Sequence, residues 1–181
     1  VYNEGETDAY ANEITDYLPE GLGFLVNHKI NYSNSWKVAN GELPQIVKLN
    51  TIENASKNLS KTDFVDVISL DSVDVIKGKV SIKSNKLQYK EGSIENLIKA
   101  FDSSKNEPDS KVLQVACIVL DDELTEKTIK NIAAITSEKD KDGKDAKDRD
   151  SQPTEIDTNT YPENTNIQDD DDFEKLVLVN K

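Results

Sequence analysis

Cysteine and histidine are both scarce in this sequence, which contains one of each among its 181 residues. A single thiol excludes an internal disulfide and a zinc cluster built from several thiolates. Cys117 lies in the apolar run KVLQVACIVL, which predicts a buried and unreactive thiol. His28 lies in the polar stretch NHKINYSNS, without a second histidine to share a metal ion. We therefore expect a surface histidine rather than a catalyst or a metal ligand.

Positive charge is also in deficit, because 22 lysines and arginines face 35 acids, a net charge of −13. The phosphates of nucleic acids and of anionic membranes would repel such a chain, so we exclude both as partners. No apolar run reaches the length of about 18 residues that would insert across a bilayer. The sequence begins VYNEGETDAY, with neither an initiator methionine nor a signal peptide, and we expect it to be part of a longer protein.

Glycine and aromatic residues are too sparse for two common kinds of enzyme. The seven glycines are scattered, so the sequence has no phosphate-binding glycine loop. At 6% aromatic residues, it has few side chains that could stack on a sugar beside paired catalytic carboxylates. We therefore do not expect an enzyme.

What the sequence does have is a series of short segments with the periodicity of β-strands. In YANEITDYL, the apolar side chains of Tyr10, Ile14 and Leu18 fall on one face of a strand. Residues 111–120 are almost continuously apolar and are predicted to form a central strand covered on both faces. Further strands are predicted at 64–70, 129–136 and 173–179, and two short runs folded about Ser84-Asn85 are predicted within 79–89.

One segment has a clear helical pattern. In SIENLIKAF, the apolar residues Ile94, Leu97, Ile98 and Phe101 fall at helical spacing behind a Ser93 N-cap. Seven or more short strands, spaced by roughly ten residues and separated by turn residues, favour an antiparallel β-sandwich. We therefore predict an all-β fold with one short helix.

Two segments interrupt this pattern. The polar stretch TIENASKNLS follows Asn50, and we interpret residues 50–90 as an insertion in a loop between core strands. Residues 138–172 have almost no apolar side chains, which is typical of a linker or a tail. The strand-forming FEKLVLV that follows them needs a partner, so we interpret 138–172 as a long acidic loop that returns the last strand to the sheet. Loops of this length are usually functional or flexible.

Several blocks of the sequence, taken in order, resemble a family of bacterial surface repeats. They are VYNEGETDAYANEITDYLPEGLGFL, SWKV, ENLIKAFD, LQVACIV, NIAAITSEKDKDGKDAKDRDSQP and DDDDFEKLVLV. Together they are similar to the tandem immunoglobulin-like repeats of secreted, clostridial-type Gram-positive cell-wall surface proteins. They are also similar to bacterial conserved-repeat domains of unknown function and, more distantly, to Cna-type B domains. The resemblance implies that residues 1–181 are one immunoglobulin-like repeat, with a first strand before Val1 and another repeat after Lys181.

The same resemblance implies an extracellular location at the cell-wall surface. It implies a passive role as a spacer or stalk, with neighbouring repeats of the same chain as partners. The alternative is an adhesin module that binds a glycan or a host protein through residues 50–90 and the region of Trp36 and Tyr32. For Trp36 itself, we favour a tryptophan that closes the core of the sandwich.

The stretch SEKDKDGKDAKDRDSQP, residues 137–153, contains the acids best placed to bind a cation. Its first acids precede Gly143 at the spacing of a helix-flanked calcium loop, but position 12 is Arg149 and a strand precedes the loop, which excludes an EF-hand. Two readings stay open: the acids share Ca²⁺, or the interleaved lysines neutralise them. The predicted calcium ligands are Asp140, Asp142, Asp145, Asp148 and Asp150, with Asp169 to Asp172 as further donors.

The resemblance also implies that a self-formed Lys-to-Asn isopeptide crosslink can occur, since related domains use one. Its lysine would lie on the first strand before Val1, and a buried acid would assist the reaction. Acids and asparagines that face water or cap turns explain the same residues. The candidate acids are Glu13 and Asp16, and the candidate acceptors are Asn131 and Asn180.

Overall fold

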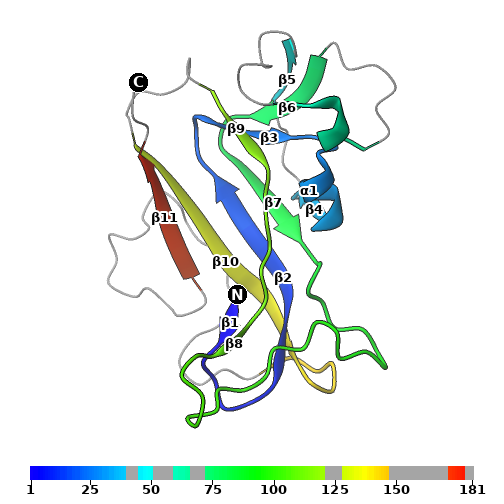
Figure 1. Cartoon of the computed structure of the whole chain (residues 1–181), viewed down its shortest axis with the longest axis vertical. Coiled ribbons are helices and arrows are strands. Elements are labelled where there is room, and N and C mark those ends of the chain that lie inside the picture. Colours follow the sequence, from blue (N-terminus) through cyan, green and yellow to red (C-terminus); the bar gives the residue numbers. More distant parts are fainter. Residues whose placement is uncertain (40–44, 51–58, 66–71, 121–127, 147–170, 178–181) are drawn as a thin grey trace. The chain divides into compact units, whose positions relative to one another are not determined.

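The computed structural model describes residues 1–39, 45–50, 59–65, 72–120, 128–146 and 171–177 (Figure 1). Its elements, in order, are β1 (Tyr2–Asn3), β2 (Ala9–Leu18), β3 (Leu22–Leu25), α1 (Lys29–Ser33), β4 (Trp36–Val38), β5 (Gln45–Asn50), the 3-10 helix η2 (Lys61–Asp63), β6 (Ser72–Lys77), β7 (Val80–Ser84), β8 (Asp109–Ser110), β9 (Cys117–Val119), β10 (Thr128–Asp140) and β11 (Asp171–Val177). The prediction of an all-β fold is confirmed, and the mostly antiparallel sheets are consistent with a β-sandwich.

The described strands form three sheets. The largest has five strands in the order β11-β10-β2-β7-β4, the second has four in the order β5-β6-β3-β9, and the third pairs β1 with β8. Contacts within the chain define two compact units, each assembled from three stretches of sequence. The first unit contains Val1–Asp16, Lys83–Leu113 and Ile132–Asp172, and the second contains Tyr17–Ile82, Gln114–Asn131 and Phe173–Lys181.

Strand β2 forms where its alternating sequence predicts a strand. The side chains of Tyr10, Ile14 and Leu18 are buried, as expected for one face of a half-buried strand. Thr15, on the other face, is also buried, so both faces of β2 are covered at this point. The strand ends before a turn in which Gly21 takes a φ of 89°, a left-handed conformation that favours glycine.

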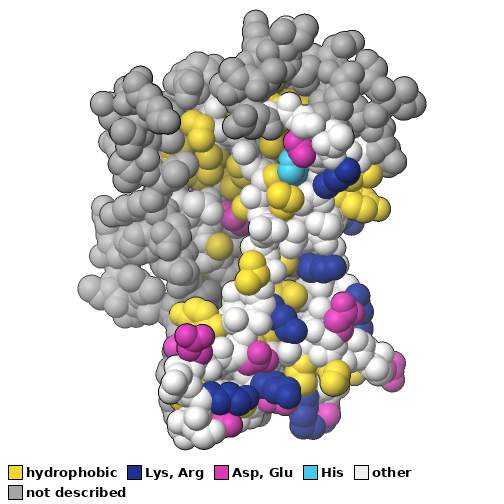
Figure 2. Space-filling view, in the orientation of Figure 1, with side chains coloured by type: hydrophobic (Ala, Val, Ile, Leu, Met, Phe, Trp, Pro, Cys, Tyr) yellow, Lys and Arg dark blue, Asp and Glu magenta, His cyan; other side chains and the backbone are white. Residues whose placement is uncertain are grey.

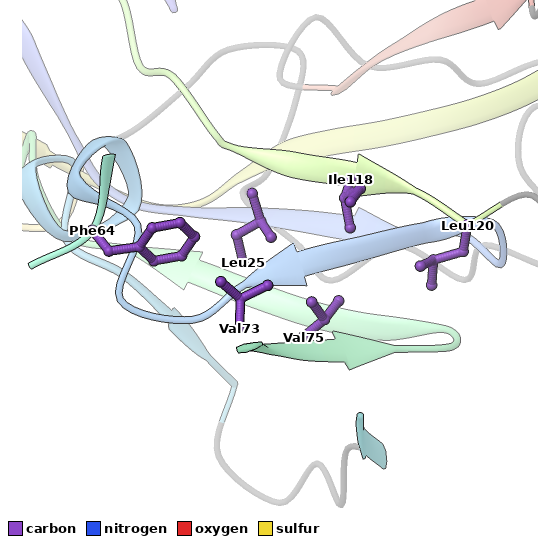
Figure 3. Packing of buried hydrophobic residues seen from close by; sticks show 6 residues of the cluster. All are labelled: Leu25, Phe64, Val73, Val75, Ile118 and Leu120. Atoms are coloured by element: carbon purple, nitrogen blue, oxygen red, sulfur yellow. The ribbon is translucent and has the colours of Figure 1, made fainter. Parts of the chain in front are cut away.

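The second unit has a core on one face of its four-stranded sheet. In this sheet β3 pairs with β6 and β9, and β6 pairs with β5, all in antiparallel register. A β-carbon on Gly23 would lie 2.3 Å from Val75 Cγ1, so glycine is required for this close approach of β3 to β6. The buried cluster, shown in Figure 3, consists of Leu25, Phe64, Val73, Val75, Ile118 and Leu120.

Helix α1 lies in the polar stretch NHKINYSNS, where the sequence pattern predicts no helix. Its Asn31 side chain is buried, and Nδ2 donates to the carbonyls of Leu25 and Ala116, each at 2.9 Å. The Oδ1 of Asn31 accepts from the Ala116 amide at 2.7 Å. Since buried polar groups must be hydrogen-bonded, these three bonds explain how an asparagine can occupy the buried side of the helix.

Residues 93–101 are not helical, so the helix predicted there is wrong. Their backbone is held by a distant strand instead: Ala9 and Ile98 exchange two hydrogen bonds, of 3.0 and 2.9 Å. Ile98 is 3% exposed whereas Ile94 is 78% exposed, so the apolar residues at helical spacing do not share one buried face. Tertiary hydrogen bonds override the local preference.

The other strand predictions are correct in part. The long strand predicted at 111–120 is wrong, because only β9 lies within it and residues 111–116 form no strand. Within 79–89, β7 confirms the first short run, whereas residues 85–89 form no strand. Strands β10 and β11 confirm the last two predicted strands. Residues 66–70 of the strand predicted at 64–70 lie outside the described residues, and the insertion at 50–90 stays a prediction.

Candidate functional site

The described beginning of the acidic stretch is a tight turn at the end of β10. The Asp140 amide donates to the Lys144 carbonyl at 2.8 Å, and the Gly143 amide donates to the Asp140 carbonyl at 3.0 Å. Oδ1 of Asp140 accepts from the amides of Asp142 and Lys144, each at 2.9 Å. A carboxylate that bonds its own backbone in this way stabilises the turn. Asp140 therefore has a structural role in the turn.

Two other predicted calcium ligands form ion pairs with neighbouring lysines. Lys141 donates to both carboxylate oxygens of Asp142 at 2.8 Å, and Lys139 pairs with Asp145. The hydrogen bond from Lys141 lowers the pKa of Asp142, and the one from Lys139 lowers the pKa of Asp145. Exposed ion pairs add little stability. This geometry agrees with the reading in which lysines neutralise the acids.

Of the predicted calcium ligands, the described ones, Asp140, Asp142 and Asp145, do not form a metal site among themselves. Within the described ranges, no group of three or more acidic, histidine or cysteine side chains is placed to hold a metal ion. Asp148 and Asp150 lie outside those ranges, as do Asp169 and Asp170. Calcium binding by the whole set of aspartates therefore stays a prediction.

The turn packs its glycine against the ring of Tyr89. Gly143 has a φ of 77°, and a β-carbon there would lie 2.5 Å from Cε1 of Tyr89. The ring of Tyr89 meets the ring of Tyr10 edge-on, with centroids 5.3 Å apart and an interplanar angle of 85°. The Tyr10 hydroxyl donates to the Ser93 carbonyl at 2.9 Å, and burial raises the pKa of Tyr10. The acidic turn therefore packs against Tyr89, and the Tyr10 ring that contacts Tyr89 is held in place by its hydrogen bond to Ser93.

A second polar group lies within the five-stranded sheet. Oε1 of Glu13, on β2, accepts from Nζ of Lys83 on β7 at 3.0 Å and from Oγ1 of Thr136 on β10 at 2.9 Å. Oγ1 of Thr136 also lies 2.8 Å from Oγ1 of Thr15, the next residue on the same face of β2. Since β10 and β7 are the two neighbours of β2, the Glu13 carboxylate links three adjacent strands.

Sequence reasoning did not identify this group, except for Glu13. Lys83 and Thr136 lie 70 and 123 residues from Glu13 along the chain, so no local motif joins them. The isopeptide hypothesis placed Glu13 beside a lysine on a strand before Val1, whereas the structure gives it Lys83 as a partner. Asp16 is buried on the opposite face of β2, and Asn180 lies outside the described residues. The crosslink stays a prediction.

The two aromatic residues proposed as a binding patch differ in exposure. Trp36 is 8% exposed, and its Nε1 donates to the Gln114 carbonyl at 2.8 Å. The prediction that Trp36 belongs to the core is therefore confirmed. Tyr32 is 71% exposed and so remains available at the surface.

The chain was compared with protein-family models, with curated proteins and with solved structures, and nothing matches it. Of the helices in the described part of the chain, none has the length and apolar character needed to cross a membrane.

The contact between Gly143 and Tyr89 can be tested with a matched pair of glycine variants. Gly143 and Gly92 have φ values of 77° and 76°, so alanine should cost about 1 kcal/mol in backbone strain at either site. Only at Gly143 would the new β-carbon meet a ring, since Gly92 has open space around it. Urea unfolding should show that Gly143→Ala loses about 1 kcal/mol more stability than Gly92→Ala. Equal losses would show that the turn does not rest on Tyr89.

Proposed function

We propose that this chain is a structural spacer module, with an immunoglobulin-like form of the β-sandwich, rather than an enzyme. The observation that carries the proposal is the carboxylate of Glu13, which hydrogen-bonds to both neighbours of β2. Strands tied together by side chains as well as by backbone bonds must separate together, because the network loses its bonds as a unit. This property suits a module that carries load along the chain.

The polar side chains of the loops support the same role. In the first unit, Oδ1 of Asp8 accepts from the Ala100 amide, and Oδ2 of Asp109 accepts from the Lys99 amide, each at 2.8 Å. These carboxylates stabilise the unit's own backbone. On the face shown in Figure 2, lysine side chains are interspersed with acidic ones, an arrangement typical of a soluble, passive surface.

The resemblance of the sequence blocks to cell-wall surface repeats agrees with this role. We therefore include in the proposal an extracellular, cell-wall location and neighbouring repeats of the same chain as partners. The adhesin alternative requires a contact surface on residues 50–90. Large apolar side chains that the structure describes in that stretch, such as Phe64, Val75 and Ile82, are buried in the protein's own core. Their burial supports the spacer over the adhesin.

Stretching single molecules of the whole chain tests the spacer proposal. Held at both ends, the chain should unfold in discrete steps that release up to about 600 Å, since each of its 181 residues extends by about 3.4 Å. Thr136→Val should lower the unfolding force without changing the released length, because Glu13 loses its bond to β10. Thr7→Val, at an exposed position, is the matched control. Smooth extension at low force, without steps, would contradict a load-bearing role.

Calcium enters the proposal as a ligand that stabilises the acidic stretch. A cation that binds only the folded state raises the melting temperature by mass action. Melting curves with excess calcium should therefore lie above those with a chelator, and the double variant Asp148→Asn, Asp150→Asn should reduce the difference. Identical curves for the unmodified chain would remove calcium and leave the lysines as the partners of the acids. The spacer role would then rest on the fold and on the hydrogen bonds of Glu13.

A further inference from the structure

We propose that His28 is an acid-sensitive latch, which holds residues 59–65 over the core of the second unit and releases them when its imidazole takes up a proton. The latch is a property of the fold and is independent of the spacer role.

The first observation is the contact between the start of α1 and residues 59–65. His28 and Phe64 form an isolated antiparallel bridge, and their rings meet edge-on with centroids 5.3 Å apart. The Val65 amide donates to the Asn27 carbonyl at 3.0 Å. Asn27 has a φ of 62°, one of two positive values among the described non-glycine residues, so the backbone turns sharply to make this contact.

The second observation is that residues 59–65 pack onto the buried cluster of the second unit. Phe64 is 5% exposed and belongs to the buried cluster of the second unit. In the view of Figure 3, its ring lies at one end of the group, next to Leu25. Leu59, from the same segment, packs against the cluster as well. Residues 59–65 therefore cover this core. The bridge and the ring contact between Phe64 and His28 help to keep them there.

The third observation is the chemistry of the imidazole. Nδ1 of His28 accepts a hydrogen bond from the Ile30 amide at 3.3 Å, in the position of an N-cap. An imidazole accepts a bond only at an unprotonated nitrogen. A proton on Nδ1 would place a donor against a donor and a positive charge at the positive end of α1. Both effects favour the neutral ring while the latch is closed.

The burial of the ring determines the direction of the pH dependence. Burial lowers the pKa of His28, and Asp63 of η2 opposes this effect. Lys29, the next residue in α1, adds a positive charge, and Phe64 is apolar. Since the pKa is below its ordinary value of about 6.5, opening favours proton uptake. The latch is therefore fully stabilised above about pH 6.5 and weakens as the pH falls through that value.

Nuclear magnetic resonance of the whole chain tests the latch directly, because His28 is the one histidine in the sequence. Its ring should titrate below about pH 6.5. Between about pH 7.5 and about pH 5.5, the hydrogen-exchange protection of the Val65 and Tyr32 amides should fall by about threefold or more, since both bond to the latch region. The Ala39 amide, which bonds to the Ser81 carbonyl in the same unit and lies outside the covered cluster, should keep its protection and serves as the internal control.

The variant His28→Asn separates the latch from general effects of acid. Asparagine can supply the N-cap acceptor but does not titrate in this range, so the protection of Val65 should no longer depend on pH. A ring that titrates at or above about pH 6.5 would overturn the proposal. So would an equal loss of protection in acid for His28→Asn. If the variant does not fold, the ring titration of the unmodified chain decides the question.

Discussion

The carboxylate of Glu13 connects the central strand β2 to both of its neighbours. It is partly buried, with 35% of its side chain exposed, and Lys83 is 27% exposed. At this depth the pair keeps part of its hydration while the protein excludes much of the competing water. Side chains alternate along a strand, so a slip of one residue in β2 would carry Glu13 to the other face and break both bonds. The carboxylate therefore fixes register as well as adding stability.

The two units use different means to hold their loops. In the first unit, polar side chains such as Asp8, Asp109 and Tyr10 bond to loop backbone, and Tyr89 supports the acidic turn. In the second unit, apolar side chains pack closely around Gly23, and Phe64 and Leu59 of residues 59–65 pack onto this cluster. The one histidine of the chain lies beside Phe64, so sensitivity to mild acid is expected in the second unit.

The sequence predicts those elements whose stability comes from their own pattern. Strand β2 is an example, since its alternating residues are buried as expected. Helix α1 is missed because its buried side is an asparagine, whose partner Ala116 lies 85 residues away. The helix predicted at 93–101 is wrong for a related reason, since bonds to Ala9 replace its internal ones. Spacing located the acids of the turn, but it could not show that Asp140 bonds its own backbone.

The most direct test of the link that Glu13 makes between strands is a double-mutant cycle between its two hydrogen-bond partners. Lys83 on β7 and Thr136 on β10 both donate to Oε1 of Glu13. We therefore expect Lys83→Met and Thr136→Val to be coupled by about 0.5 kcal/mol or more in the free energy of unfolding. Effects that add within about 0.3 kcal/mol would show that the two bonds act independently, and would contradict a sheet held together through this carboxylate.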